Sequence, residues 1–135
     1  MGGKVSVIDG EMFEIAKVID FDIPGVSPEQ IQPVSMRFSA DGKKAYGAIG
    51  LANCVAVVNT NTFDEKDYVL EGQRPWHGGI APNGSKPYVA NDLTNDMTII
   101  DLAALKPDKS IPVGGLPWGI PLRPNAIVTR ATPLP

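Results

Sequence analysis

Three of the four residues of this chain that could bind a ligand lie in one stretch, residues 73–84, with the sequence QRPWHGGIAPNG. His77 is the single histidine of the 135-residue chain, and histidine is the side chain that ordinarily changes charge near neutral pH. Trp76 and the later Trp118 are the two tryptophans, and both could stack on a ligand. Arg74 could face an anionic ligand. These four residues are the candidate ligand-binding residues of the sequence.

Each of the four candidates also has a structural explanation. A histidine without a partnered motif is most often hydrogen-bonded to a backbone carbonyl or to water, and we favour this role for His77. Trp76 and Trp118 lie 42 residues apart, and a residue that recurs in a repeat is first a packing residue. We therefore expect the two tryptophans to wedge between neighbouring units. Arg74 precedes the recurring proline in one unit only, and we favour a place on a solvated rim for it over contact with an anionic ligand.

The remaining sequence offers little for catalysis, a metal or a cofactor. Cys54 is the only cysteine, and a metal site would need several histidine, cysteine or carboxylate ligands to converge. The carboxylates of Asp92, Asp96 and Asp101 lack the close alternation of a calcium loop, so we expect ordinary turn and strand-end roles for them. The sequence has no CxxCH motif, no glycine-rich phosphate loop and no nucleophile elbow. We expect no metal, no cofactor and no catalytic residue, and favour a binding protein over an enzyme.

Composition and charge narrow the class of protein further. Fifteen acidic against twelve basic residues give a net charge of −3, which provides no electrostatic reason to bind nucleic acid. No apolar run approaches the roughly 20 residues that span a bilayer, so we expect no membrane span. The amino terminus lacks the order of a secretory signal peptide. The 14 glycines and 13 prolines, spread along the chain, indicate many short elements joined by turns.

The sequence repeats itself at an interval of 42 residues. Pro33, Pro75 and Pro117 are spaced in this way, and so are the turn pairs Asp41-Gly42 and Asn83-Gly84. The other positions that share the interval are Phe38, Ile80 and Leu122; Tyr46 and Tyr88; Asn53 and Asn95; and Val57-Val58 with Ile99-Ile100. So many positions in one register identify a structural repeat.

Each repeat unit contains four short strand patterns. The segment VSMRFSADGKKAYGAI predicts a hairpin around Asp41-Gly42, because glycine accepts a positive φ. CVAVVNT and MTIIDL are continuous apolar runs typical of strands covered on both faces, and KDYVLEG and DKSIPVGG supply a weaker fourth strand. Four strands in 42 residues are typical of a β-propeller blade, whose sheet packs face to face with its neighbours around a central channel. A β-sandwich is disfavoured, because sandwiches keep no long period.

We predict an all-β chain of about three blade units that form an incomplete ring. Residues 1–23 are the third and fourth strands of one blade, residues 33–71 and 75–114 are full blades, and residues 117–135 are the first strand of a further blade with a degenerate end. A propeller has about 4–8 blades, so either the chain belongs to a longer propeller or copies associate through exposed blade faces. Pro87 is a misfit, since it falls where an interior strand should donate a hydrogen bond.

Several segments resemble the YVTN-type β-propeller repeat proteins, namely KPYVAND, VSVIDGEMFEIAKVI and MTIIDLAALKPDKSIPVGGLPWGI. More narrowly, QPVSMRFSADGKKAYGAIGLANCVAVVN followed by GQRPWHGGIAPNG resembles the propeller proteins associated with pyrroloquinoline-quinone-dependent alcohol catabolism. The resemblance extends to about Asn125, and Pro87 and Ala126 depart from it. It implies that the full-length parent is a periplasmic or secreted ring, usually of about seven blades.

The resemblance favours a non-catalytic binding or scaffolding propeller, accessory to periplasmic quinone-dependent oxidation of alcohols. Its partner would be a protein or a small molecule at the mouth of the channel. The alternative is a subunit or fragment of a quinoprotein dehydrogenase, with pyrroloquinoline quinone as the cofactor of the parent system. In that case Trp76 and His77 would lie near the redox ligand.

Overall fold

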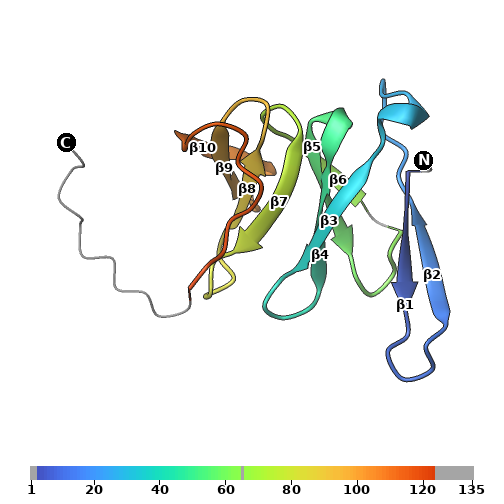
Figure 1. The fold of residues 1–135 in the computed structure, drawn as a ribbon. Helices are drawn as coiled ribbons and strands as arrows, with labels where there is room; N and C mark the ends of the chain where they lie inside the picture. Colours follow the sequence, from blue (N-terminus) through green and yellow to red (C-terminus); the bar gives the residue numbers. More distant parts are fainter. Residues whose placement is uncertain (1–2, 65, 124–135) are drawn as a thin grey trace.

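The computed structural model describes residues 3–64 and 66–123 of the chain, and this part is all β. Its strands form three antiparallel sheets that stand side by side (Figure 1). The first sheet has two strands and the other two have four each. The strands are β1 (Lys4–Ile8) and β2 (Ile15–Asp20); β3 (Pro33–Phe38), β4 (Lys44–Ile49), β5 (Cys54–Asn59) and β6 (Lys66–Leu70); and β7 (Pro75–Ile80), β8 (Pro87–Asn91), β9 (Asp96–Asp101) and β10 (Lys106–Pro112).

Both four-stranded sheets have their strands in chain order, β3-β4-β5-β6 and β7-β8-β9-β10, as propeller blades do. We call them the middle blade and the third blade, and the β1–β2 hairpin the first half-blade. Two short 3-10 helices, η1 (Pro28–Gln30) and η2 (Gly50–Ala52), lie in connections. The predicted all-β architecture of an incomplete propeller is confirmed.

The repeated turn pairs make the hairpins that the sequence predicts. Gly42 and Gly84 have φ values of 70° and 72°, which glycine adopts without strain. Each also donates its backbone N–H to the carbonyl oxygen of the residue three positions earlier, at 2.9 Å for Gly42 and 2.7 Å for Gly84. Pro87 is accommodated because it is the first residue of β8, opposite the last residue of β7, where its missing N–H interrupts the ladder least.

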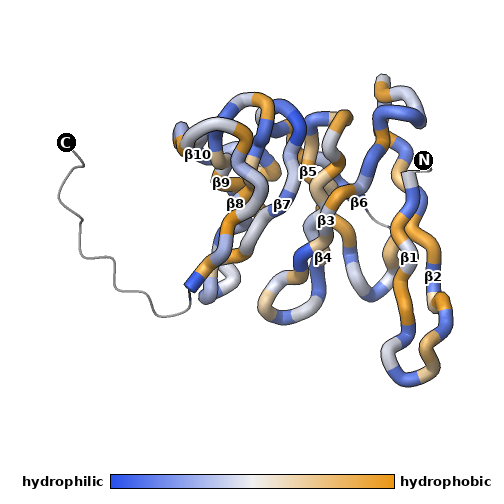
Figure 2. The backbone as a smooth tube through the Cα atoms, viewed as in Figure 1, coloured by the Kyte–Doolittle hydropathy of each residue, from blue (hydrophilic) through white to orange (hydrophobic). Residues whose placement is uncertain are grey.

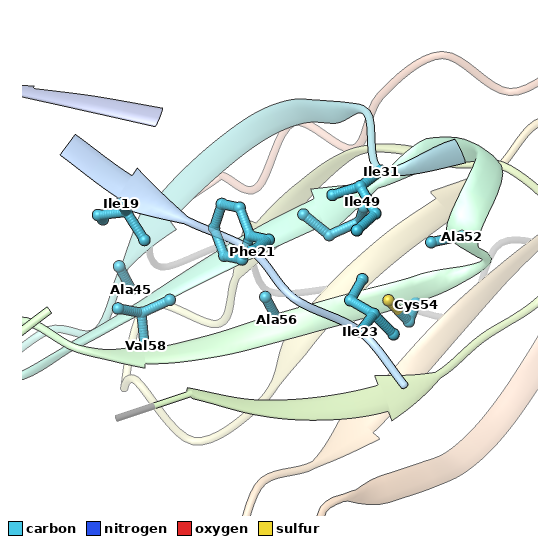
Figure 3. Close-up of a cluster of buried hydrophobic side chains, with 10 residues drawn as sticks. All are labelled: Ile19, Phe21, Ile23, Ile31, Ala45, Ile49, Ala52, Cys54, Ala56 and Val58. Carbon is cyan, nitrogen blue, oxygen red and sulfur yellow. The ribbon is translucent and has the colours of Figure 1, made fainter. Parts of the chain in front are cut away.

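The core consists of two apolar layers between neighbouring sheets. Alternate residues of β5 point to opposite faces, so Cys54, Ala56 and Val58 belong to the layer beside the first half-blade (Figure 3). Val55 and Val57 belong to the layer beside the third blade. This two-sided burial explains why β5 is a continuous apolar run. The buried members of the second layer are Tyr46, Val55, Val57, Val69, Val89 and Ile100.

The ends of the row leave apolar side chains exposed. The β1–β2 hairpin carries long hydrophobic segments (Figure 2), and Phe13 and Ile15 are 84% and 62% exposed. At the other end, residues 117–123 do not form the strand that the repeat predicts. They nevertheless lie against β7, because a Cβ built on Gly79 would be 2.8 Å from the carbonyl oxygen of Ile120. A first strand pairs with a second strand, and by the 42-residue interval that second strand falls outside the described residues.

Candidate functional site

The backbone around Arg74 belongs to the repeated scaffold. Arg74 lies in the connection from β6 to β7 with a φ of 58°, and its N–H donates to Asn53 Oδ1 at 2.9 Å. One repeat later, the N–H of Leu116 donates to Asn95 Oδ1 at the same distance, and Leu116 also has a positive φ, of 51°. The recurring asparagine therefore fixes where each following blade begins, whatever side chain stands at position 74.

The side chain of Arg74 makes contacts specific to its own blade. Its guanidinium lies 3.3 Å from a carboxylate oxygen of Asp92 and 4.7 Å from the ring centroid of Trp76, measured from Nη1 and from Cζ. The Asp92 side chain is 6% exposed, while that of Arg74 is 38% exposed. The residues 42 positions earlier are Gln32 and Gly50, which carry no charge. The ion pair and the cation–π contact therefore distinguish the third blade from the middle blade.

Trp76, which lies beside this ion pair, neighbours two further aromatic side chains, His77 and Trp118. The rings of Trp76 and Trp118 are 5.9 Å apart at a tilt of 42°, and the ring of His77 approaches Trp76 edge-on at 6.3 Å. Trp76 is half-buried, whereas Trp118 is 69% exposed. The structure thus places Arg74, Trp76, His77 and Trp118 in one cluster, which we call the rim cluster. The wedging role predicted for the tryptophans stays a prediction, because the described residues end at Arg123 and contain no further blade beyond Trp118.

The innermost strands hold the rim cluster next to the middle blade. Ser35 on β3 donates its hydroxyl to the carbonyl oxygen of Trp76 at 2.8 Å, and Arg37 Nε donates to the carbonyl oxygen of Gly78 at 2.9 Å. Ser35 and His77 occupy equivalent positions of the repeat. The rim cluster is therefore attached to two sheets, which makes its position more rigid than that of a surface loop.

The three carboxylates considered as a calcium loop have separate roles. Asp92 pairs with Arg74, whereas Asp101 Oδ1 accepts the N–H groups of Ala103 and Ala104 in the β9–β10 turn. Among residues 3–64 and 66–123, no three or more His, Cys, Asp and Glu side chains come close enough to hold a metal ion. The described part also contains no helix with the length and apolar character needed to cross a bilayer.

Sequence reasoning missed a second polar group, buried between the middle and third blades. Asn91 Nδ2 donates to Asp96 Oδ1 at 3.0 Å and to Thr98 Oγ1 at 2.7 Å, and both Asn91 and Thr98 are buried. Glu71 faces them from the end of β6, and both of its carboxylate oxygens are buried. We call Glu71, Asn91, Asp96 and Thr98 the inter-blade polar cluster. The 42-residue alignment could have revealed it, because Asn91 stands where the previous unit has Ile49.

Burial perturbs two titratable groups of the middle blade, Glu71 at this interface and Cys54 in the layer beside the first half-blade. Desolvation, and then the nearby charge of Asp96, raise the pKa of Glu71 to about 7, although the Thr98 hydroxyl acts in the opposite direction. Desolvation, with a smaller effect of the charge of Glu71, raises the pKa of the Cys54 thiol to about 12. Cys54 is therefore an unreactive packing residue at neutral pH, as we expect for a buried thiol.

Comparison with known proteins supports the fold and gives no name for the activity. No protein-family model matches the sequence, and no curated protein matches it. Among solved structures, a 6-phosphogluconolactonase-like protein from Bacteroides fragilis is 27% identical over 87% of this chain and 35% of its own length, with a TM-score of 0.67. The hydrazine synthase of Kuenenia stuttgartiensis is 24% identical over 73% of this chain and 29% of its own, with a TM-score of 0.65. The dihydro-heme d1 dehydrogenase NirN is 19% identical over 83% of this chain and 22% of its own, with a TM-score of 0.63.

These structures are β-propeller-type folds, and the chain spans about a third or less of the length of each. Their names point to different activities, so the likeness concerns the fold. The chain has the fold of a partial β-propeller.

Proposed function

We propose that this chain is part of a non-catalytic β-propeller whose rim cluster binds a planar, anionic small molecule at one end of the blades. The observation that carries the proposal is the contact series from Arg74 through Trp76 to Trp118, at 4.7 Å and 5.9 Å. Tryptophan faces bind flat conjugated groups, and a guanidinium binds carboxylates with directed hydrogen bonds. The exposure of Trp118 leaves the cluster accessible to such a ligand.

The identity of the residues in the repeat supports a binding role. Residues that shape a blade recur in each unit, whereas Arg74 and His77 occur in one unit only: the equivalent residues are Gln32 and Ser35 in the previous unit and Leu116 and Gly119 in the next. These two residues add a positive charge and an imidazole on either side of Trp76, a tryptophan that recurs as Trp118. These are groups that bind ligands more than groups that hold sheets together.

The resemblance to YVTN-type proteins, and to those associated with pyrroloquinoline-quinone-dependent alcohol catabolism, suggests the setting. We propose an exported parent protein that assists periplasmic quinone-linked oxidation of alcohols. The alternative is a part of a quinoprotein dehydrogenase with its redox ligand near the mouth of the channel. Pyrroloquinoline quinone is itself planar and anionic, so its ring would lie against Trp76 and Trp118 and a carboxylate would pair with Arg74. Bound there, it would supply two-electron redox chemistry.

A fluorescence titration with pyrroloquinoline quinone, with and without calcium, tests the proposal. We expect saturable, stoichiometric quenching of tryptophan emission, weakened about tenfold or more by Arg74→Gln and by His77→Ser, which install the residues of the previous unit. Lys43→Gln is the charge-matched control, because Lys43 is exposed in the β3–β4 turn. Absence of saturable quenching, or equal weakening by Lys43→Gln, would refute binding at the rim cluster. Alcohol-dependent reduction of a dye by the loaded protein would favour the dehydrogenase alternative.

A further inference from the structure

Glu71 occupies a position that the other units fill with an apolar residue. Its backbone N–H donates to the carbonyl oxygen of Asn53 at 2.9 Å, directly after β6. The same backbone bond runs from Phe21 to Gly3 and from Val113 to Asn95 in the neighbouring units. Phe21, Glu71 and Val113 therefore occupy the same structural position in their units, and of the three only Glu71 can carry a charge.

The side chain of Glu71 points into the layer between the middle and third blades. Val69 lies two residues earlier on the same face of β6 and packs in the layer that contains Val89 and Ile100. At the corresponding end of the first layer, the structure packs Phe21 with Ile49, Cys54 and Ala56, all labelled in Figure 3. The second layer has Glu71, Asn91, Asp96 and Thr98 at these four positions.

The inter-blade polar cluster has more acceptors than donors. Both hydrogens of Asn91 Nδ2 are used, on Asp96 and Thr98, and the hydroxyls of Thr94 and Ser110 both donate to Asp96. Both oxygens of Glu71 and Oδ1 of Asn91 are buried, and none has a hydrogen bond within the described part of the chain. The Thr98 hydroxyl is the remaining side-chain donor of the cluster. Three buried acceptors thus compete for one hydrogen, and unpaired buried acceptors are costly.

The charges around Glu71 make its ionised form unfavourable. Burial opposes the ionisation of Asp96 on β9, but hydrogen bonds from Ser110, Thr94 and Asn91 outweigh it and lower the pKa of Asp96. Asp96 is therefore a fixed negative charge beside Glu71. From β5, the Cys54 thiol is neutral. The nearby cation on the same connection, Arg74, is already paired with Asp92.

We propose that Glu71 binds a proton between the two blades near neutral pH, and that its neutral carboxyl donates this hydrogen to Asn91 Oδ1. One proton then supplies the missing donor and removes the charge that faces Asp96. Ionisation would leave a charge and two orphaned acceptors in the interface, which weakens this end of the contact between blades. The weakened end is the one that carries the rim cluster. Gly72 lies directly against Asn91, since a Cβ built on it would be 2.7 Å from Asn91 Nδ2. Arg74 of the rim cluster follows Gly72 by two residues. The proton site itself does not depend on any ligand at the rim.

The direction of the pH dependence follows from the raised pKa of Glu71. A carboxyl with a higher pKa in the folded state than in the unfolded chain stabilises the fold at low pH, and this stabilisation is lost as the pH rises from the ordinary pKa of 4.5 to the folded value of about 7. The first-layer equivalents suggest a matched variant, Glu71→Phe with Asn91→Ile, in which the interface has no titratable group at position 71.

Infrared difference spectroscopy of the 135-residue chain detects the proton directly. We expect the folded wild type to show a protonated carboxyl band at about pH 6 that disappears by about pH 8.5, with Glu71→Gln lacking the band. Glu14→Gln, which alters an exposed carboxylate, should retain it. The urea midpoint of the wild type should fall as the pH rises from about 4.5 to about 7, where the folded chain holds a proton on Glu71 that the unfolded chain has lost, and it should stay level in Glu71→Gln and in the double variant. A wild type without a carboxyl titrating above about pH 6, or a band that persists in Glu71→Gln, would overturn the proposal even if a variant folds poorly.

Discussion

Replacement of Trp76 by alanine should cost less than the loss of a fully buried tryptophan. Truncating a buried Phe or Trp to Ala costs about 3–5 kcal/mol, and a tryptophan wedged between two closed blades would approach that value. Trp76 is half-buried. Of the two residues beside its ring, the Arg74 side chain is 38% exposed and Trp118 is 69% exposed. About half of the full value applies, so we expect Trp76→Ala to lower the free energy of unfolding by about 1.5–2.5 kcal/mol.

Urea unfolding followed by far-ultraviolet circular dichroism measures this loss without relying on tryptophan emission. Trp76→Val, which installs the residue of the previous unit, should recover part of it, because Val34 packs at the same position beside Gly50. Trp118→Ala should cost less than about 1 kcal/mol, since little of its ring is covered. A loss of about 4 kcal/mol or more for Trp76→Ala would show a buried wedge and refute the description of this residue as part of an accessible surface.

Three further predictions concern the scaffold around the rim cluster. Asn53→Ala should cost about 1–2 kcal/mol in urea unfolding, because it removes the acceptor of the Arg74 N–H and puts alanine at a φ of 53°; Asn53→Gly should cost less, and equal losses would contradict the φ argument. Gly72→Ala should cost about 1–3 kcal/mol, since its Cβ would be 2.6 Å from Thr94 Oγ1; an unchanged midpoint would contradict this close contact. Cys54 should react with an aromatic disulfide reagent only at the rate of unfolding, because it is buried and its pKa is about 12; fast labelling of the folded chain would contradict its burial.

Much of the fold could be predicted from the sequence because the repeat carries its own turn chemistry. Asp41-Gly42 and Asn83-Gly84 fix the hairpins, and the continuous apolar run of β5 indicates burial on both faces. The repeat predicts a strand after Pro117, but residues 117–123 form none. Strand geometry needs a hydrogen-bonding partner as well as a sequence pattern. The sequence pattern predicts a misfit at Pro87, but at the first position of β8 a proline is tolerated.

The candidate site could be predicted in part. The 42-residue interval puts Trp118 one blade after Trp76, and neighbouring positions around a propeller axis lie side by side, so the rim cluster follows from the spacing. The pairing of Arg74 with Asp92 could not be predicted, since it depends on how the β6–β7 connection turns at a positive φ. Glu71 was missed because it ends a strand pattern, where a polar residue usually faces solvent. Its burial depends on the packing of the next blade.

The central claim is that residues 42 positions apart occupy equivalent places in sheets packed face to face. Methyl–methyl nuclear Overhauser effects in the 135-residue chain test it most directly. The structure predicts cross-peaks that join Val55 and Val69 of the middle blade to Val89 and Ile100 of the third blade. If these cross-peaks are absent, while the strand pairings within each sheet are intact, the sheets do not pack as propeller blades and the account is wrong.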